Sequence, residues 1–477
     1  MEGEHFDVII IGAGLSGLAA GIRLALYDKK VILLERHNVI GGLNSFYSIA
    51  GRKYDVGLHA ITNYAPNIKK SPLNKLFRQL RIHPGEFNLS PQIQSRIIFD
   101  NCNLLFNNNL DFLKSQITEQ FPSQIDGFNK LCSTIEEEFL AFTPEKETLS
   151  ALPIIANFIT DPLLIHLLLL PPLYYGSPLE NDITWNQFVI LFKSIFLEGL
   201  ARPYEGIRLI LRILKDKYKF LGGIRKMKCG VQQIISSNNR VDKLILDDGS
   251  SISANHIISS IGLPETLNLC SPPPSSSTNY KNTIGKISFI ETASIIKDQP
   301  KNLGWNDTII FFNDSKQLHY NAPQSLVNTH SGVICIPNNY DYPNKQELPE
   351  GIIRTTVLGN YDLWNKLPQE EYHNEKRYWF DIIHQKALTF LPQIPSNHLN
   401  SIILAQDMFT PKTINKYTGR LNGAVYGSTQ KNFSGNTHLK NLYICGTDQG
   451  LLGITGSMLS GITIANKLVL TQNSSFD

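Results

Sequence analysis

The chain has 477 residues, too long for one ordinary hydrophobic core, so two domains or one interleaved pair are expected. Lys and Arg number 44 against 41 Asp and Glu, and this balance argues against nucleic acid as a partner. The 6 cysteines contain no C-x-x-C pair, so neither a metal site nor a disulfide scaffold is predicted. The first residues carry no signal-peptide pattern, and a cytoplasmic location is expected.

The first predicted unit is a strand, a glycine-rich turn, a helix and a second strand over residues 6–35. Residues 6–11 are continuously apolar, as in a parallel strand buried on both faces. The G-x-G-x-x-G turn that follows lets backbone approach a pyrophosphate at a helix N-terminus, and the second strand ends at an acid placed to accept ribose hydroxyls. Simple turn glycines with a capping acid are the alternative. The predicted dinucleotide ligands are Gly12, Gly14, Leu15, Ser16, Gly17 and Glu35.

A glycine pair follows this unit, where a nicotinamide-binding domain has no need of one. After Arg36 the chain reaches Gly41 and Gly42, and then Leu43 and Asn44. This arrangement resembles the extended FAD motif of the amine oxidase superfamily, in particular the phytoene desaturase, carotenoid isomerase and retinol saturase-like proteins. The resemblance implies that all five residues lie along the cofactor, with backbone at the pair close to its phosphates. Leu43 takes the place of the family's usual Arg.

The resemblance continues through residues 51–59, where an aromatic residue precedes D-x-G. In the family the chain turns here toward the isoalloxazine ring, which implies that Gly57 and Leu58 contact the cofactor. His59 stands where retinol saturase-like members also carry histidine, so it is a catalytic candidate. The alternative is a histidine that is only hydrogen-bonded beside a buried strand.

Two later stretches resemble the remaining FAD motifs of the family. Residues 219–262 form a strand-rich unit in which Val231 takes the position that pairs with adenine. The strand at residues 441–445 is followed by a G-x-D turn, in which Asp448 is expected to receive ribityl hydroxyls unless it is an ordinary helix cap. Tyr426 resembles a residue near the flavin face and is a second catalytic candidate, with strand packing as the alternative. The further cofactor residues implied here are Gly446, Gly453, Ile454 and Gly456.

Motifs near both ends and in the middle predict a discontinuous nucleotide domain. We expect an α/β fold with a Rossmann-like FAD-binding domain of the two-dinucleotide-binding type and an inserted mixed α+β substrate domain. The FAD domain is assigned to residues 1–90, 203–290 and 415–470, and the substrate domain to 91–202 and 291–414. A helix over residues 163–170 is predicted to end at Pro171 and Pro172, and its length of about 12 Å is too short for a bilayer core of about 30 Å.

The residues give no nucleophile with a base and no paired acids, so the cofactor must supply the chemistry. The resemblance implies FAD and the desaturation, saturation or cis–trans isomerisation of a long polyene or isoprenoid-like lipid. A flavin amine oxidase and a non-catalytic prenyl-lipid escort protein are the alternatives. A basic cluster is interpreted as a solvated helix face, or else as a peripheral membrane contact with anionic headgroups. It consists of Lys215, Lys217, Lys219, Arg225, Lys226 and Lys228.

Overall fold

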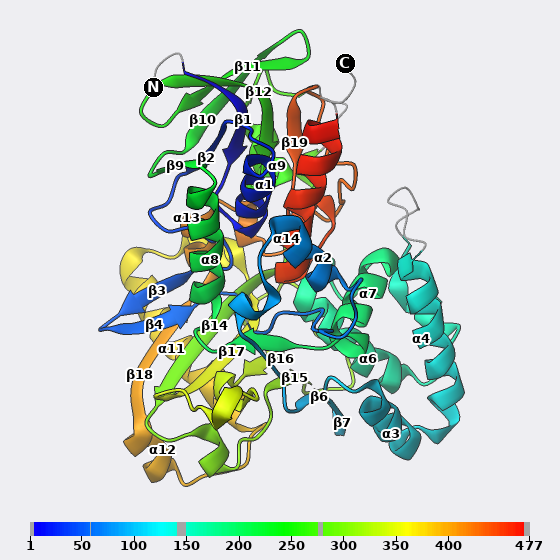
Figure 1. The fold of residues 1–477 in the computed structure, drawn as a ribbon. Coiled ribbons are helices and arrows are strands. Elements are labelled where there is room, and N and C mark those ends of the chain that lie inside the picture. The colour runs from blue at the N-terminus through cyan, green and yellow to red at the C-terminus, as the bar shows by residue number, and fades with distance from the viewer. Residues whose placement is uncertain (1–3, 58, 141–148, 275–279, 472–477) are drawn as a thin grey trace.

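The structure, a computed structural model, describes residues 4–57, 59–140, 149–274 and 280–471. A mainly parallel sheet forms the upper half of the molecule in Figure 1. Its strand order is β13-β10-β11-β12-β1-β2-β9, with β19 paired to β12. The strands are β1 (His5–Ile11), β2 (Val31–Glu35), β9 (Ile224–Met227), β10 (Val231–Ser237), β11 (Arg240–Leu246), β12 (Ser251–Ser259), β13 (Cys270–Ser271) and β19 (Leu442–Ile444).

Strand β1 is buried on both faces, which explains its continuous apolar sequence. Val8 and Ile10 pack into one core cluster, and Ile9 and Ile11 pack into another on the opposite side. Helix α1 (Leu15–Ala25) covers the first face and packs against α14 (Gly453–Ile464) and α8 (Ile207–Phe220). The start and the end of the chain therefore meet beside one strand. All strands of this sheet lie within the ranges assigned to the nucleotide domain.

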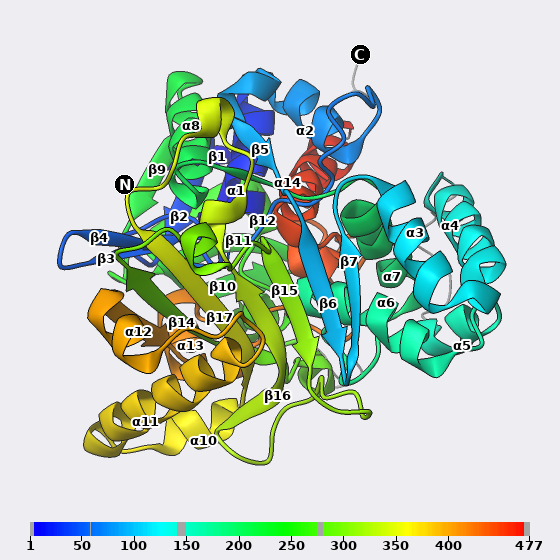
Figure 2. The same ribbon diagram turned by 90° about the horizontal axis from the view of Figure 1, so that it is seen from below.

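A second sheet of seven strands lies below the first, with strand order β18-β14-β17-β16-β15-β6-β7. All its pairs are antiparallel except β15 with β6. The strands are β6 (Ser95–Phe99), β7 (Cys102–Phe106), β14 (Ser288–Ile296), β15 (Ile309–Asn313), β16 (Val327–Cys335), β17 (Gly351–Gly359) and β18 (Ile403–Phe409). Figure 2 shows α10 (Tyr361–Lys366), α11 (Gln369–Leu388) and α12 (Ser396–Ile402) together along one side of this sheet.

The other face of the second sheet packs against a lobe of helices. Phe311 of β15 points into this core, whereas the adjacent Phe312 packs on the opposite side of the sheet. The lobe lies to the right in Figure 1. Its helices are α3 (Leu110–Gln120), α4 (Ile125–Leu140), α5 (Ala151–Ala156), α6 (Pro162–Gly176) and α7 (Trp185–Phe192).

The predicted end of α6 is wrong. The helix continues through Pro171 and Pro172 to Gly176, so its 15 residues span about 22 Å. Both prolines lack the N–H that would bond the carbonyls four residues earlier, which is normally costly inside a helix. Here the surrounding turns are buried against α7, β6 and β15, and this packing outweighs the local preference. Over the part of the chain that the structure describes, none of the helices combines the length and the apolar character needed to span a bilayer.

Candidate functional site

A cavity of about 740 Å³ extends from the carboxyl ends of β1 and β2 to the second sheet. This edge of a parallel sheet is where open α/β folds bind their ligands. Both catalytic candidates, His59 and Tyr426, line the cavity. So do most residues predicted to bind the cofactor, namely Gly12, Gly14, Leu15, Ser16, Glu35, Arg36, Gly41, Gly42, Leu43, Asn44, Gly57, Val231, Gly446, Gly453 and Ile454.

Two predicted glycines do not line the cavity. A Cβ on Gly17 would lie 2.2 Å from the Gly12 carbonyl oxygen, so this glycine allows α1 to begin tightly against the turn. A Cβ on Gly456 would lie 3.0 Å from the Leu451 carbonyl carbon, so this glycine serves the same purpose at the start of α14. Both glycines therefore allow close backbone packing at the start of a helix. Leu58 lies outside the described residues.

The geometry around Gly14 fits a bound pyrophosphate. Gly14 is the N-cap of α1, which has no side-chain cap and no acid in its first turn. A Cβ built on Gly14 would meet no atom within 4 Å, and the glycine pair lies beside it through a parallel bridge from Gly14 to Gly41. Helix α14 also starts without a side-chain cap or an acid, and its first residue, Gly453, lines the same cavity. Two uncapped helix N-termini therefore offer N–H donors to one anionic ligand.

Glu35, the last residue of β2, and Arg36, which follows it, both line the cavity where the dinucleotide is expected to bind. Glu35 accepts backbone N–H groups from Ala13 and His37, each at 2.8 Å, and a carboxylate has further lone pairs for ribose hydroxyls. Arg36 donates to the Val231 carbonyl at 2.8 Å and pairs with Asp247 at 2.9 Å. The Val231 carbonyl thus has a protein partner, and Arg36 ties the end of β2 to β10.

Asp448 has a different role from the one expected. Its side chain is fully buried, does not line the cavity and accepts N–H groups from Leu263 at 2.6 Å and Ser428 at 2.7 Å. Arg420 Nη1 lies 3.5 Å from Oδ2, and Lys431 Nζ lies 4.0 Å from Oδ1. Burial alone would raise the pKa of Asp448, but these two cations and the backbone donors outweigh it and hold the pKa below its usual value.

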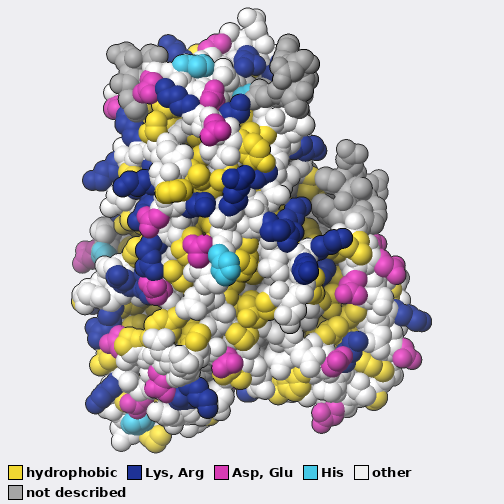
Figure 3. Space-filling view, in the orientation of Figure 1, with side chains coloured by type: hydrophobic (Ala, Val, Ile, Leu, Met, Phe, Trp, Pro, Cys, Tyr) yellow, Lys and Arg dark blue, Asp and Glu magenta, His cyan; other side chains and the backbone are white. Residues whose placement is uncertain are grey.

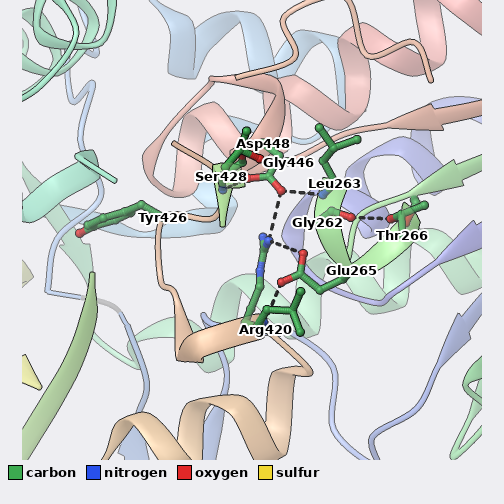
Figure 4. Close-up of polar contacts among 12 residues, drawn as sticks. Gly262, Leu263, Glu265, Thr266, Arg420, Tyr426, Ser428, Gly446 and Asp448 are labelled. Carbon is green, nitrogen blue, oxygen red and sulfur yellow. Dashed lines mark hydrogen bonds and ion pairs between the residues drawn. The ribbon is translucent and has the colours of Figure 1, made fainter. Parts of the chain in front are cut away.

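Asp448 therefore joins three separate chain segments beneath the cavity, and Figure 4 shows the Arg420 side chain reaching between Asp448 and Glu265. Arg420 Nη1 is 3.6 Å from Glu265 Oε2, and both of these side chains line the cavity. Lys431 donates to the Tyr426 carbonyl at 2.6 Å, and burial lowers its pKa to about 8. This cluster fixes the segment that carries Tyr426.

The far end of the cavity is an aromatic chamber. The Tyr426 ring lies edge-on to Phe289 with centroids 5.7 Å apart, and Tyr174 stacks on the same phenylalanine at 5.8 Å. The Tyr426 hydroxyl donates to the Tyr174 carbonyl, and burial raises its pKa well above the ordinary value. The hydroxyl proton is therefore held by a backbone carbonyl. This geometry supports a role for Tyr426 in forming the cavity wall more than a role in proton transfer. Val333 and Leu452 also line this part of the cavity.

His59 meets a buried charge pair that sequence reasoning missed. Its Nε2 lies 3.0 Å from Thr356 Oγ1 and 3.4 Å from Glu291 Oε2, and Arg354 Nε donates to Glu291 Oε1 at 2.6 Å. Burial would raise the pKa of Glu291, but Arg354 and His59 outweigh it and lower the pKa. Burial lowers the pKa of His59, although its hydrogen bond to Glu291 opposes this, so the imidazole is neutral at pH 7.

One signal for this pair was present in the sequence. Glu291 is a lone acid in the strand at residues 288–296, and Arg354 is a lone base in the strand at residues 351–359. A buried charge requires a partner, so the two could have been matched. Their pairing also depends on strand register, which places Glu291 opposite Thr356.

The fold and the cavity define a dinucleotide-binding protein of the α/β class, built as a Rossmann-like domain with an inserted α+β part. A family profile described as NAD(P)-binding Rossmann-like domain matches residues 10–80. An oxidoreductase structure from Methanosarcina mazei superposes with a TM-score of 0.68 at 16% identity, covering 97% of this chain and 100% of that one. The predicted fold class is confirmed.

Named relatives are similar to the chain in sequence. A chloroplastic prolycopene isomerase from Daucus carota is 23% identical over 94% of this chain and 74% of its own length. A phytoene desaturase from Fusarium fujikuroi is 22% identical over 61% of this chain and 55% of its own length. The resemblance predicted from the glycine motifs is thereby confirmed. Together with the dinucleotide fold, it points to a flavin cofactor.

Proposed function

We propose that the protein is an FAD-dependent oxidoreductase that acts on carbon–carbon bonds of a long hydrophobic polyene or isoprenoid-like lipid. The reaction is a desaturation, a saturation or a cis–trans isomerisation. One observation carries the proposal: a single cavity begins at the dinucleotide cradle around Gly14 and ends in the aromatic chamber of Tyr174, Phe289 and Tyr426. A redox cofactor and an apolar substrate would meet where these two parts join.

FAD is favoured over a nicotinamide dinucleotide because the cradle has a second glycine wall. Gly41 donates its N–H to the Ala13 carbonyl at 2.9 Å, and a Cβ on Gly42 would lie 3.6 Å from the Gly14 Cα. Backbone therefore borders the phosphate position on two sides, in keeping with the family motif. A prenyl-lipid escort protein without a cofactor would have no physical need for this cradle.

When bound, FAD supplies hydride transfer through its isoalloxazine ring. The chain's own residues bind and orient the cofactor and the substrate, and they exclude water. The N-terminus of α1 would hold the phosphates, the N-terminus of α14 would face the flavin, and Glu35 would receive ribose hydroxyls. The aromatic chamber holds the substrate by apolar burial, at about 25 cal/mol per Å². His59 remains neutral, and its contacts with Thr356 and Glu291 fix the orientation of its ring at this chamber.

A panel of polyenes incubated anaerobically with the FAD-loaded protein tests the proposal. The FAD is supplied in its oxidised form and, separately, in its reduced form. We expect at least one polyene to lose two hydrogens to oxidised FAD, to gain two from reduced FAD, or to change its isomer pattern, as measured by chromatography and mass spectrometry. Protein stripped of FAD is the control and should leave the panel unchanged. Turnover of amines in place of every polyene would support the amine oxidase alternative and contradict the proposal.

We also propose that the protein contacts anionic lipid headgroups at the membrane surface and takes up its substrate there. Phe220 at the end of α8 is 83% exposed, next to Lys217 and Lys219. On the face that carries α8, Figure 3 shows Lys and Arg side chains interleaved with hydrophobic ones. An exposed aromatic residue among cations suits a membrane interface.

Sedimentation with vesicles tests this contact. We expect the protein to pellet with phosphatidylserine-containing vesicles and not with phosphatidylcholine alone, and Phe220→Ser should weaken pelleting. Tyr378→Ser is the matched control, because Tyr378 is also exposed (59%) but lies on α11. Equal pelleting of both variants and the wild type would contradict the assigned surface.

A further inference from the structure

The contact with Glu291 fixes the hydrogen position on the His59 ring. Nε2 faces the Glu291 carboxylate at 3.4 Å and the Thr356 hydroxyl at 3.0 Å, and Thr356 itself donates to Glu291 Oε2 at 3.2 Å. The Thr356 hydroxyl has one hydrogen and donates it to Glu291, so toward His59 it accepts, and Nε2 carries the hydrogen of the neutral imidazole. Nδ1 must then be the acceptor nitrogen.

Nδ1 of His59 has no hydrogen-bond partner among the residues that the structure describes. The ring lines the cavity, and its side chain is 14% exposed. An acceptor that is fixed in orientation and lacks a protein partner is suited to a ligand that donates a hydrogen bond.

Most other polar side chains of the chamber already have hydrogen-bond partners, so few of them compete with His59 for a hydroxyl group of a ligand. The Tyr174 hydroxyl bonds Ser331 Oγ at 3.0 Å, and the Tyr426 hydroxyl bonds a backbone carbonyl. Among the tyrosines that line this chamber, Tyr175 of α6 has a buried hydroxyl with no partner within the described ranges. The chamber therefore combines aromatic walls with one fixed acceptor and one uncommitted hydroxyl. An alcohol O–H matches this set, whereas an ether or a hydrocarbon cannot donate to Nδ1.

We propose that the chamber selects a long apolar substrate that carries a hydroxyl group, and that this hydroxyl donates its hydrogen bond to His59 Nδ1. Glu291, held as an anion by Arg354, is a positioning residue because it sets which ring nitrogen faces the substrate. The inference rests on the proposed function, since it concerns the substrate end of the same cavity.

Binding of a matched ligand pair tests the inference. The probes are a long polyprenyl alcohol and its methyl ether, titrated by calorimetry into the FAD-loaded protein. We expect the alcohol to bind about tenfold more tightly, as one net hydrogen bond in a desolvated site would give. Equal affinities would overturn the inference.

Two variants distinguish the loss of the hydrogen-bond acceptor from a general loss of folding. His59→Gln places an amide nitrogen where Nε2 donates but leaves no acceptor at the Nδ1 position, so we expect the preference for the alcohol to disappear while the ether binds as before. His166→Gln is the control, because His166 stacks on Phe99 outside the cavity. It should keep the preference. A preference that survives His59→Gln would refute the assignment.

A pH titration of the wild type gives a test that needs no variant. Protonation of Nδ1 removes the acceptor, so the preference should hold at neutral pH and fall as pH drops through the His59 pKa, which burial places below the ordinary 6.5. The ether should bind equally throughout, and a preference independent of pH would contradict the inference. The groups facing His59 are Glu291, Thr356, Arg354 and Arg202, with the Tyr340 hydroxyl and the Cys335 thiol at its carbonyl.

Failure of the two proposals can be told apart. The ligand preference is a binding measurement and does not require turnover, so it can hold even if no polyene is converted. Conversely, if the protein converted hydrocarbons and ethers as readily as alcohols, the proposed function would stand and the inference about the hydroxyl group would be wrong.

Discussion

Replacing Asp448 with asparagine tests the view that this residue joins three chain segments beneath the cavity. The side chain is fully buried, and both oxygens accept backbone N–H groups. An asparagine keeps one acceptor oxygen and presents an NH2 group to the other donor, either Leu263 or Ser428. The substitution also removes the anion that faces Arg420 and Lys431.

The expected loss follows from these contacts. An unsatisfied buried donor costs about 1–3 kcal/mol, and removing one partner from a buried charge cluster costs about 3–5 kcal/mol. The two costs overlap because they concern the same side chain, so we expect a total loss of about 3–5 kcal/mol. That is a large share of a typical unfolding free energy of about 5–15 kcal/mol.

The assay is urea denaturation of the FAD-free protein at neutral pH. Asp216→Asn is the control, because Asp216 pairs with Lys215 on the surface with side chains 60% and 41% exposed. It should change the free energy of unfolding by less than about 1 kcal/mol. If Asp448→Asn also changed it by no more than the control, the buried cluster would not stabilise the fold as argued.

The pH dependence gives a second readout of the same residue. The folded-state pKa of Asp448 lies below the ordinary 3.8, so its carboxylate stabilises the protein above pH 3.8 and this contribution is lost as pH falls through the folded pKa. The wild type and Asp448→Asn should therefore approach each other in stability in strong acid. A constant difference down to the acid limit would show that charge is not the cause.

Three further predictions concern the cavity. Glu35→Arg should remove most bound FAD, because a cation would replace the carboxylate that braces Ala13 and receives ribose hydroxyls; unchanged flavin absorbance would refute this. Gly17→Ala should also lower FAD occupancy, since its Cβ would lie 2.2 Å from the Gly12 carbonyl oxygen. Gly85→Ala is the control for loss of a glycine, because the added Cβ would meet only the His83 side chain, at 3.1 Å. His59→Ala should slow turnover in a single-turnover assay while FAD stays bound, and equal rates would return His59 to a purely structural role.

The nucleotide half of the cavity could be predicted because its signals are local. The strand, turn, helix and acid between Phe6 and Glu35 are contiguous, and each residue's role follows from its place in one βαβ unit. The cradle residues around Gly14 and Gly41 consequently line the cavity as expected. Asp448 was harder, because its partners Leu263 and Ser428 come from distant segments.

The substrate half depends on contacts that sequence spacing does not reveal. Glu291 and Arg354 meet only because β14 and β17 pair in one particular register, and a shift by one residue would separate them. Helix α6 continues through Pro171 and Pro172 because tertiary packing supports it, which no local preference predicts. The orientation of His59 in turn depends on Glu291.

The most direct test of the central claim is the visible absorption spectrum of the purified protein, followed by identification of the nucleotide released on denaturation. We expect flavin absorption bands and one FAD per chain, both lost in Glu35→Arg. A colourless protein that takes up no FAD when it is supplied, or one that releases a nicotinamide dinucleotide instead, would contradict it.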